Sequence, residues 1–179
     1  MATIIPAKNG NSAPNDRDIS RVNSTILRLE LRPFALNTTE AFLQARGFSQ
    51  NQAALVAKEA CIHKLEVHNT AAEENNKALT LNLEKWMVLS QAKTHPPIIR
   101  ESWPLMFEKK FTTKQPSEPA IIAFNWALFP TKQIFWAADY NWGLIAFGLN
   151  VDTKFDLQLT WQIGKQVYNK TLKNLRCGK

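Results

Sequence analysis

The stretch "KFDLQLTWQIGKQVYNKTL", residues 154–172, sets the expectation for the fold. Its first half alternates strictly between apolar and polar side chains, which is the two-residue period of a half-buried β-strand. The apolar positions are Phe155, Leu157, Leu159, Trp161 and Ile163. Gly164 and Lys165 follow and predict a two-residue turn of type II′, with a returning strand that runs to about Cys177. The sequence therefore predicts an antiparallel hairpin at this end of the chain.

Outward from this hairpin, further stretches have strand character. Alternation recurs in "TILRLELRPF" (25–34), "CIHKLEVHN" (61–69) and "ALTLNLEKWMVL" (78–89). The segments "AIIAFNWALF" (120–129) and "WGLIAFGL" (142–149) are almost unbroken apolar runs, and such runs favour central strands that are covered on both faces.

A helical hairpin is expected between residues 37 and 60. Asn37 with Glu40, and Ser49 with Gln52, have the spacing of capping boxes, and Gly47 between them is a helix C-terminal signal. Residues 94–110 contain three prolines and predict a connecting loop or a short turn of helix.

These elements together predict a mainly β protein, an antiparallel β-sandwich of immunoglobulin-like architecture. We expect about seven or eight strands, with the short helical hairpin inserted after the first strand. Residues 1–22 are polar and aperiodic and predict a flexible leader or linker, so that 23–179 form a single domain.

The charge pattern gives no sign of nucleic-acid binding. The net charge is +7, but the basic residues are dispersed and no nucleic-acid-binding motif accompanies them. The densest basic group is predicted to be a solvated face, and its members are Lys165, Lys170, Lys173, Arg176 and Lys179. No apolar stretch reaches the roughly 20 residues of a membrane span, so no transmembrane segment is expected.

The state of the two cysteines, Cys61 and Cys177, depends on the cellular compartment of the protein. In an oxidising compartment they would form a disulfide, whereas in a reducing cytosol they would be two small buried apolar residues. We expect the disulfide, and with it a periplasmic or secreted location. The N-terminus has no apolar signal-peptide region, so the signal sequence would be absent from this chain.

Metal binding and catalysis have weak support. Cys61 and His63 lie on one face of a predicted strand, but this single C-x-H pair is better explained as half of a disulfide beside a core or edge histidine. A blue-copper ligand loop is excluded because only Gly178 and Lys179 follow Cys177. No nucleophile elbow or phosphate-binding loop is present, so we expect no cofactor, no metal and no enzymatic activity.

The aromatic residues between 127 and 149 divide into core and loop. Residues 131–142 mix aromatic and polar side chains in a loop at an end or edge of the sandwich. The candidate partner-binding residues are Phe135, Trp136, Asp139, Tyr140, Asn141 and Trp142. Two interpretations stay open: Phe135 and Trp136 close the end of the core, or Trp136, Tyr140 and Trp142 form a recognition patch.

The leading hypothesis is a non-enzymatic, extracytoplasmic domain that docks onto a protein partner. It would be an accessory or assembly subunit of a larger membrane-associated or extracytoplasmic complex. A carbohydrate-binding module that uses the loop 131–142 is the alternative, with Asp139 and Asn141 meeting sugar hydroxyls. Copper or zinc handling through Cys61 and His63 is a second alternative.

Overall fold

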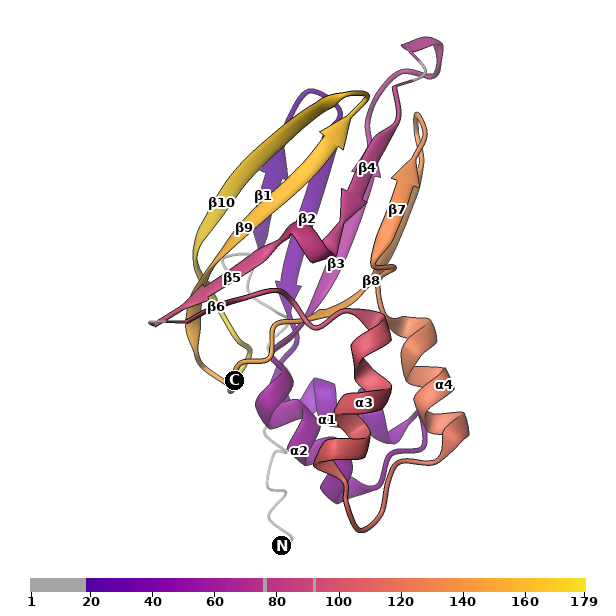
Figure 1. The fold of residues 1–179 in the computed structure, drawn as a ribbon, viewed down its shortest axis with the longest axis vertical. Helices are drawn as coiled ribbons and strands as arrows, with labels where there is room; N and C mark the ends of the chain where they lie inside the picture. The colour runs from indigo at the N-terminus through magenta and orange to yellow at the C-terminus, as the bar shows by residue number, and fades with distance from the viewer. Residues whose placement is uncertain (1–18, 76, 92) are drawn as a thin grey trace, which may run out of the picture.

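The part of the chain that the structure describes forms two antiparallel β-sheets with four α-helices at one end (Figure 1). The computed structural model describes residues 19–179 except 76 and 92. Sheet A has the order β1-β2-β3-β8, and its strands are β1 (Ser20–Asn23), β2 (Leu27–Pro33), β3 (Ile62–Asn69) and β8 (Tyr140–Ala146). Sheet B has the order β6-β5-β9-β4-β7, with β10 paired to β9. Its strands are β4 (Leu79–Asn82), β5 (Met87–Ser90), β6 (Lys93–His95), β7 (Lys132–Phe135), β9 (Lys154–Ile163) and β10 (Gln166–Arg176).

The main core lies between the two sheets. The inward residues of β9 that the alternation marks, from Phe155 to Trp161, are buried here, together with Leu65 and Val67 of β3. The prediction of a mainly β, antiparallel sandwich is therefore confirmed, although the described residues contain ten strands rather than seven or eight.

A second core joins the helices to one end of sheet A. The helices are α1 (Leu36–Gln44), α2 (Gln50–Ala60), α3 (Trp103–Lys110) and α4 (Glu118–Ala127). Short 3-10 helices lie at Glu73–Asn75, Leu83–Lys85 and Arg100–Ser102. From the helices come Trp103, Phe107 and Phe124, whose rings contact one another, and from the sheet come Ile62 and Leu144.

The predicted C-terminal hairpin is confirmed. β9 and β10 pair antiparallel, beginning with Ile163 opposite Gln166, and Gly164 in the turn between them has φ +57°. Lys165 is not among the residues with positive φ, so only the first turn residue is left-handed, as a type II′ turn requires.

The prediction of a central strand over residues 120–129 is wrong. Residues 118–127 form helix α4, in which the Ser117 hydroxyl accepts a hydrogen bond from the Ala120 N–H and Pro119 lies in the first turn. These are helix start signals, and they outweigh the continuous apolar run because a helix packed on the second core buries Ala120 and Phe124 equally well. Trp126, expected in the core, is 81% exposed.

The helical hairpin is present, but with one of its two predicted caps. Ser49 and Gln52 form the capping box of α2, whereas α1 begins after Ala35 without a side-chain cap. The Asn37 side chain accepts a hydrogen bond from the adjacent Thr38 N–H instead. Residues 94–110, expected as a loop or a short turn of helix, contain the two-turn helix α3.

The first strand lies earlier than predicted. β1 spans Ser20–Asn23 and buries Val22, so the hairpin follows the second strand, and the last residues of the predicted leader belong to sheet A. The rest of that leader, residues 1–18, lies outside the described residues.

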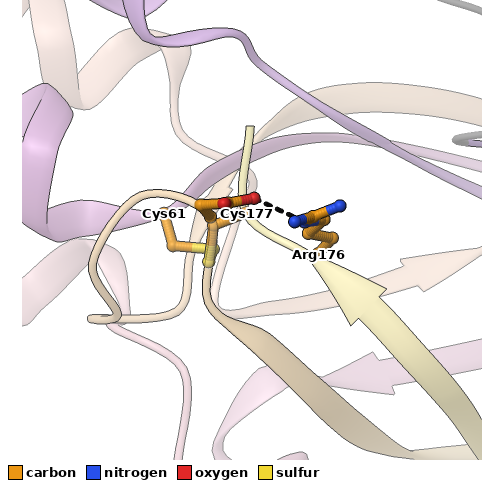
Figure 2. The surroundings of a disulfide bond; sticks show 4 residues. Cys61, Arg176 and Cys177 are labelled. Atoms are coloured by element: carbon orange, nitrogen blue, oxygen red, sulfur yellow. Dashed lines mark ion pairs between the residues drawn. A yellow bond between two sulfur atoms is a disulfide. The ribbon is translucent and has the colours of Figure 1, made fainter. Parts of the chain in front are cut away.

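The predicted disulfide between Cys61 and Cys177 is present and buried (Figure 2). It joins the end of α2 to the end of β10 across 116 positions of sequence. Figure 2 also shows Arg176 beside it, and this guanidinium forms an ion pair with Asp152 at 2.5 Å. The Lys179 carbonyl accepts from the Leu36 N–H, which fixes the chain end against the start of α1.

Replacing both cysteines, Cys61→Ala with Cys177→Ala, should lower the free energy of unfolding by about 4–5 kcal/mol, because the unfolded chain regains the entropy of a long loop. Urea unfolding followed by tryptophan fluorescence measures this loss. Wild-type protein refolded under reducing conditions is the control and should show the same loss. An unchanged urea midpoint in the double variant would contradict the prediction.

Candidate functional site

The aromatic segment crosses from one sheet to the other. Phe135 ends β7 in sheet B, and Tyr140 begins β8 in sheet A, so residues 136–139 connect the two layers. Phe135 is fully buried and packs on Phe129. The prediction that Phe135 contacts a partner is therefore wrong, and its side chain closes the core instead. Phe135 faces inward because it pairs with Leu79, another buried residue, across β4 and β7.

The connecting turn is held by its own backbone and by Asp139. The Asp139 carboxylate accepts from the Trp136 N–H at 2.7 Å, and the Asp139 N–H donates to the Trp136 carbonyl at 3.1 Å. The Asn69 N–H donates to the Asp139 carbonyl at 2.9 Å, which ties the turn to the end of β3. Trp136 is 54% exposed on this fixed turn, and the Asp139 side chain is committed to holding it.

The sequence predicts Tyr140 and Asn141 in a loop with Trp142 at its edge, but all three residues form the first half of strand β8. Tyr140 pairs with His68 and Trp142 with Glu66, so both rings project from the outer face of sheet A. They are 54% and 53% exposed. Asn141 points the other way: its amide donates to the Gln133 side chain at 2.6 Å and links the edges of the two sheets.

The same face of β8 is covered farther along the strand. Leu144 and Ala146 continue the row of Tyr140 and Trp142 but are buried in the second core under the helices. Between Trp142 and Leu144, Gly143 permits the chain at Phe129 to lie against β8, because a Cβ at this position would approach the Phe129 nitrogen to 2.6 Å. The aromatic pair therefore stands where the helical cover ends.

Charged side chains of β2 and β3 complete this surface, which we call the open face. Its residues are Arg28, Glu30, Lys64, Glu66, His68, Tyr140 and Trp142. The ammonium of Lys64 lies 4.9 Å from the Trp142 ring centroid and 2.7 Å from a Glu66 carboxylate oxygen. The Tyr140 hydroxyl donates to Glu66 at 3.3 Å. Partial burial first, and then the Glu66 charge, raise the pKa of Tyr140, so its hydroxyl remains a donor.

Glu30 is the buried charge of the open face. Arg28 and Arg32 donate to its carboxylate at 2.9 and 3.0 Å, and Arg21 at 3.3 Å. Hydrogen bonds from these arginines, Arg28 foremost, lower the pKa of Glu30 to about 2, although its burial acts in the opposite direction. A hollow of about 190 Å³ lies among Arg28, Glu30, Glu66 and Tyr140.

The sequence did not link these charges to the aromatic segment. Alternation places Arg28, Glu30 and Glu66 on the polar sides of their strands, but β3 and β8 pair across more than 70 residues of sequence. No local signal specifies such a long-range pairing, so the charged half of the open face was missed.

The disulfide removes Cys61, the first ligand of the metal-handling alternative. The Cys61 sulfur is bonded to Cys177 and offers no thiolate. His63 is a core histidine, 1% exposed, with its ring edge-on to Phe147 and Phe155. Burial lowers the pKa of His63 to about 4, although the backbone of Cys61, Arg176 and Ile62 acts in the opposite direction and raises it. The ring is therefore neutral near pH 7. In the part of the chain that the structure describes, no three His, Cys, Asp or Glu side chains gather as a metal site.

Comparison of the chain with protein-family models, with curated proteins and with solved structures gave no match. Among residues 19–179, apart from 76 and 92, no helix is long and apolar enough to cross a membrane.

Glu30→Gln should lower the free energy of unfolding at pH 7 and make that free energy depend less on pH in the acid range. Because the folded pKa of about 2 lies below the unfolded value of 4.5, the carboxylate contributes stability above pH 4.5, and this is lost as the pH falls towards 2. At about 1.4 kcal/mol per pKa unit the contribution is at most about 3–4 kcal/mol, and solvent screening of the arginines makes it smaller.

Urea unfolding at pH 7, 4.5 and 3 measures this contribution. Glu74→Gln, at an exposed position on a 3-10 helix, is the matched control and should leave the pH dependence unchanged. Parallel loss of stability by wild type and Glu30→Gln between pH 4.5 and 3 would contradict the assignment.

Proposed function

We propose that this chain is a non-enzymatic, extracytoplasmic β-sandwich that docks onto a protein partner through the open face and the adjoining Trp136 turn. The observation that carries the proposal is the group of Trp136, Tyr140 and Trp142, each more than half exposed beside a well-packed core. Large aromatic side chains left in water at neighbouring positions are typical of surfaces that another protein covers.

The rigidity of these side chains supports docking. Tyr140 and Trp142 stand on a strand that is paired to β3, and Trp136 stands on a turn held by Asp139. Rings that are already fixed lose little conformational entropy when a partner orders them. Lys64, Glu66 and Arg28 around the rings supply the polar rim that such interfaces have.

The disulfide supports an extracytoplasmic place. A buried Cys61–Cys177 bond forms and persists in oxidising compartments, where a domain of this kind would serve as an accessory or assembly subunit. The partner we propose is a protein of an extracytoplasmic complex that is itself associated with the membrane.

Site-specific photo-crosslinking in the native host tests the docking surface. A benzoylphenylalanine in place of Trp142 or Tyr140 should give one discrete adduct, because both positions lie inside the proposed interface. The matched control is the same probe at Trp126, an exposed aromatic position on α4 outside the open face, and it should not give that adduct.

Trp142→Ala should weaken co-purification of the cross-linked partner at least tenfold, since truncation of a central aromatic residue removes about 2 kcal/mol or more of binding energy. Equal cross-linking from all three positions would contradict the proposal. So would a chain that is always monomeric and without a partner when purified from native membranes.

Carbohydrate binding remains the second candidate, and the side-by-side rings of Tyr140 and Trp142 favour it. Two residues apart on one strand face, they are about 7 Å apart along β8 and form a platform on which sugar rings can stack. Asp139 and Asn141, however, already bond within the protein, and Lys64 occupies one side of Trp142.

Titration with a panel of oligosaccharides, followed by tryptophan fluorescence, separates the two candidates. A sugar-binding module should give a saturable change that Trp142→Ala abolishes and Trp126→Ala, the exposed-tryptophan control, preserves. No response to any oligosaccharide in the panel would remove this candidate and leave the protein partner.

A further inference from the structure

A second surface of the molecule, separate from the open face, lies along strand β10. This strand is 11 residues long and pairs with β9 alone, so its other edge is unpaired within the described residues. Figure 1 shows β10 on the outer side of β9, at the margin of the sandwich. The regular part of this edge, which we call the β10 edge, comprises residues 166–172 and ends at the bulge between Leu172 and Leu175.

The other sheet edges are short or covered. β1 and β7 have four residues each, and β6 has three. β8 is capped by Leu128, which bridges to Leu144, and by the Phe129 N–H, which donates to the Leu144 carbonyl at 2.8 Å. Proteins usually protect long edges in these ways, and among the described residues the β10 edge is the longest edge that remains open.

The β10 edge is exposed to solvent over most of its length. All residues from Gln166 to Thr171 are exposed, including Val167 at 61% and Tyr168 at 36%. Tyr168 lies on the inward side, where its ring stacks on Trp161, yet sheet A does not cover it. In an antiparallel strand, every second residue directs its N–H and C=O away from the paired neighbour. About three or four residues of the β10 edge therefore offer unpaired backbone groups to another strand.

The charges decide which strand would fit. Residues 165–179 contain five basic side chains and no acidic one. Arg176 and Lys179 form ion pairs with Asp152, whereas no ion pair of the described residues includes Lys165, Lys170 or Lys173. A second copy of this chain added antiparallel would bring lysines against lysines, which is repulsive. An extended segment rich in Asp or Glu would meet them with opposite charge.

We propose that the β10 edge binds an extended acidic segment of another protein by adding it as a further strand to sheet B. Backbone hydrogen bonds would hold the segment. Lys170 within the edge, with Lys165 and Lys173 directly at its two ends, would select the charge of the segment. This surface is independent of the open face, so either can fail without the other.

A synthetic seven-residue peptide with blocked ends, in which glutamate alternates with valine, is the probe for the full-length chain. We expect saturable binding by calorimetry and slowed hydrogen exchange at the amides of residues 166–172. Two control peptides test the mode of binding: one has lysine in place of glutamate, and the other has N-methylated backbone amides on the edge-facing side. Both should bind at least tenfold more weakly.

The double variant Lys170→Glu with Lys173→Glu should bind the acidic peptide at least tenfold more weakly than the wild type does. Lys109→Glu with Lys114→Glu, an equal charge change at exposed lysines in and after α3, should weaken it less than twofold. Trp142→Ala should leave the affinity unchanged, which separates this surface from the docking site proposed above.

Three results would overturn the proposal. The first is the absence of saturable binding at millimolar peptide, which would mean that the lysines only keep the edge solvated. The second is equal binding of the N-methylated peptide, or of single-stranded DNA of the same charge, which would mean polyelectrolyte attraction without strand addition. The third is concentration-dependent dimerisation that Lys170→Glu with Lys173→Glu does not alter.

Discussion

The arrangement of the molecule depends on the outer face of β3 and β8, which changes from apolar to polar along its length. At one end Ile62, Leu144 and Ala146 are apolar on the side away from the main core, so this side needs a cover. The helices supply it, and their aromatic side chains form the second core. Past Leu144 the row continues with Trp142 and Tyr140 beside charged neighbours, and the cover stops. One strand pair thus fixes both the position of the helices and that of the open face.

The two proposed binding surfaces lie where this scaffold leaves strands uncovered. On sheet A, aromatic rings stand among charges that are already paired with one another, as Lys64 is with Glu66. On sheet B, within the described residues, lysines that form no ion pair lie along a strand with an unpaired edge. The first surface favours a partner with its own apolar side chains and a polar rim, and the second favours charge and backbone complementarity. Together they would let one small domain hold two different segments of an assembly.

Sequence reasoning succeeded where the pattern was local. The β9–β10 hairpin follows from alternation and from Gly164, and the α2 cap from Ser49 with Gln52. It failed for α4, because an apolar run such as 120–129 is compatible with a strand or with a helix on a large core. Only the helix start signals at Ser117 and Pro119, which precede the run, favour the helix. It also could not assemble the open face, since the pairing of Glu66 with Trp142 is specified by tertiary packing.

The bond between Cys61 and Cys177 also sets the covalent topology of the chain. Everything from β3 to the end of β10 lies inside one closed ring, which includes the exposed segment 112–115 between α3 and α4. A protease that cuts this segment opens the ring without releasing a fragment, because both pieces stay joined through the sulfurs. Under oxidising conditions a nicked molecule would therefore keep both sheets and both candidate surfaces in one covalent unit, and it would separate into two chains only after reduction and unfolding.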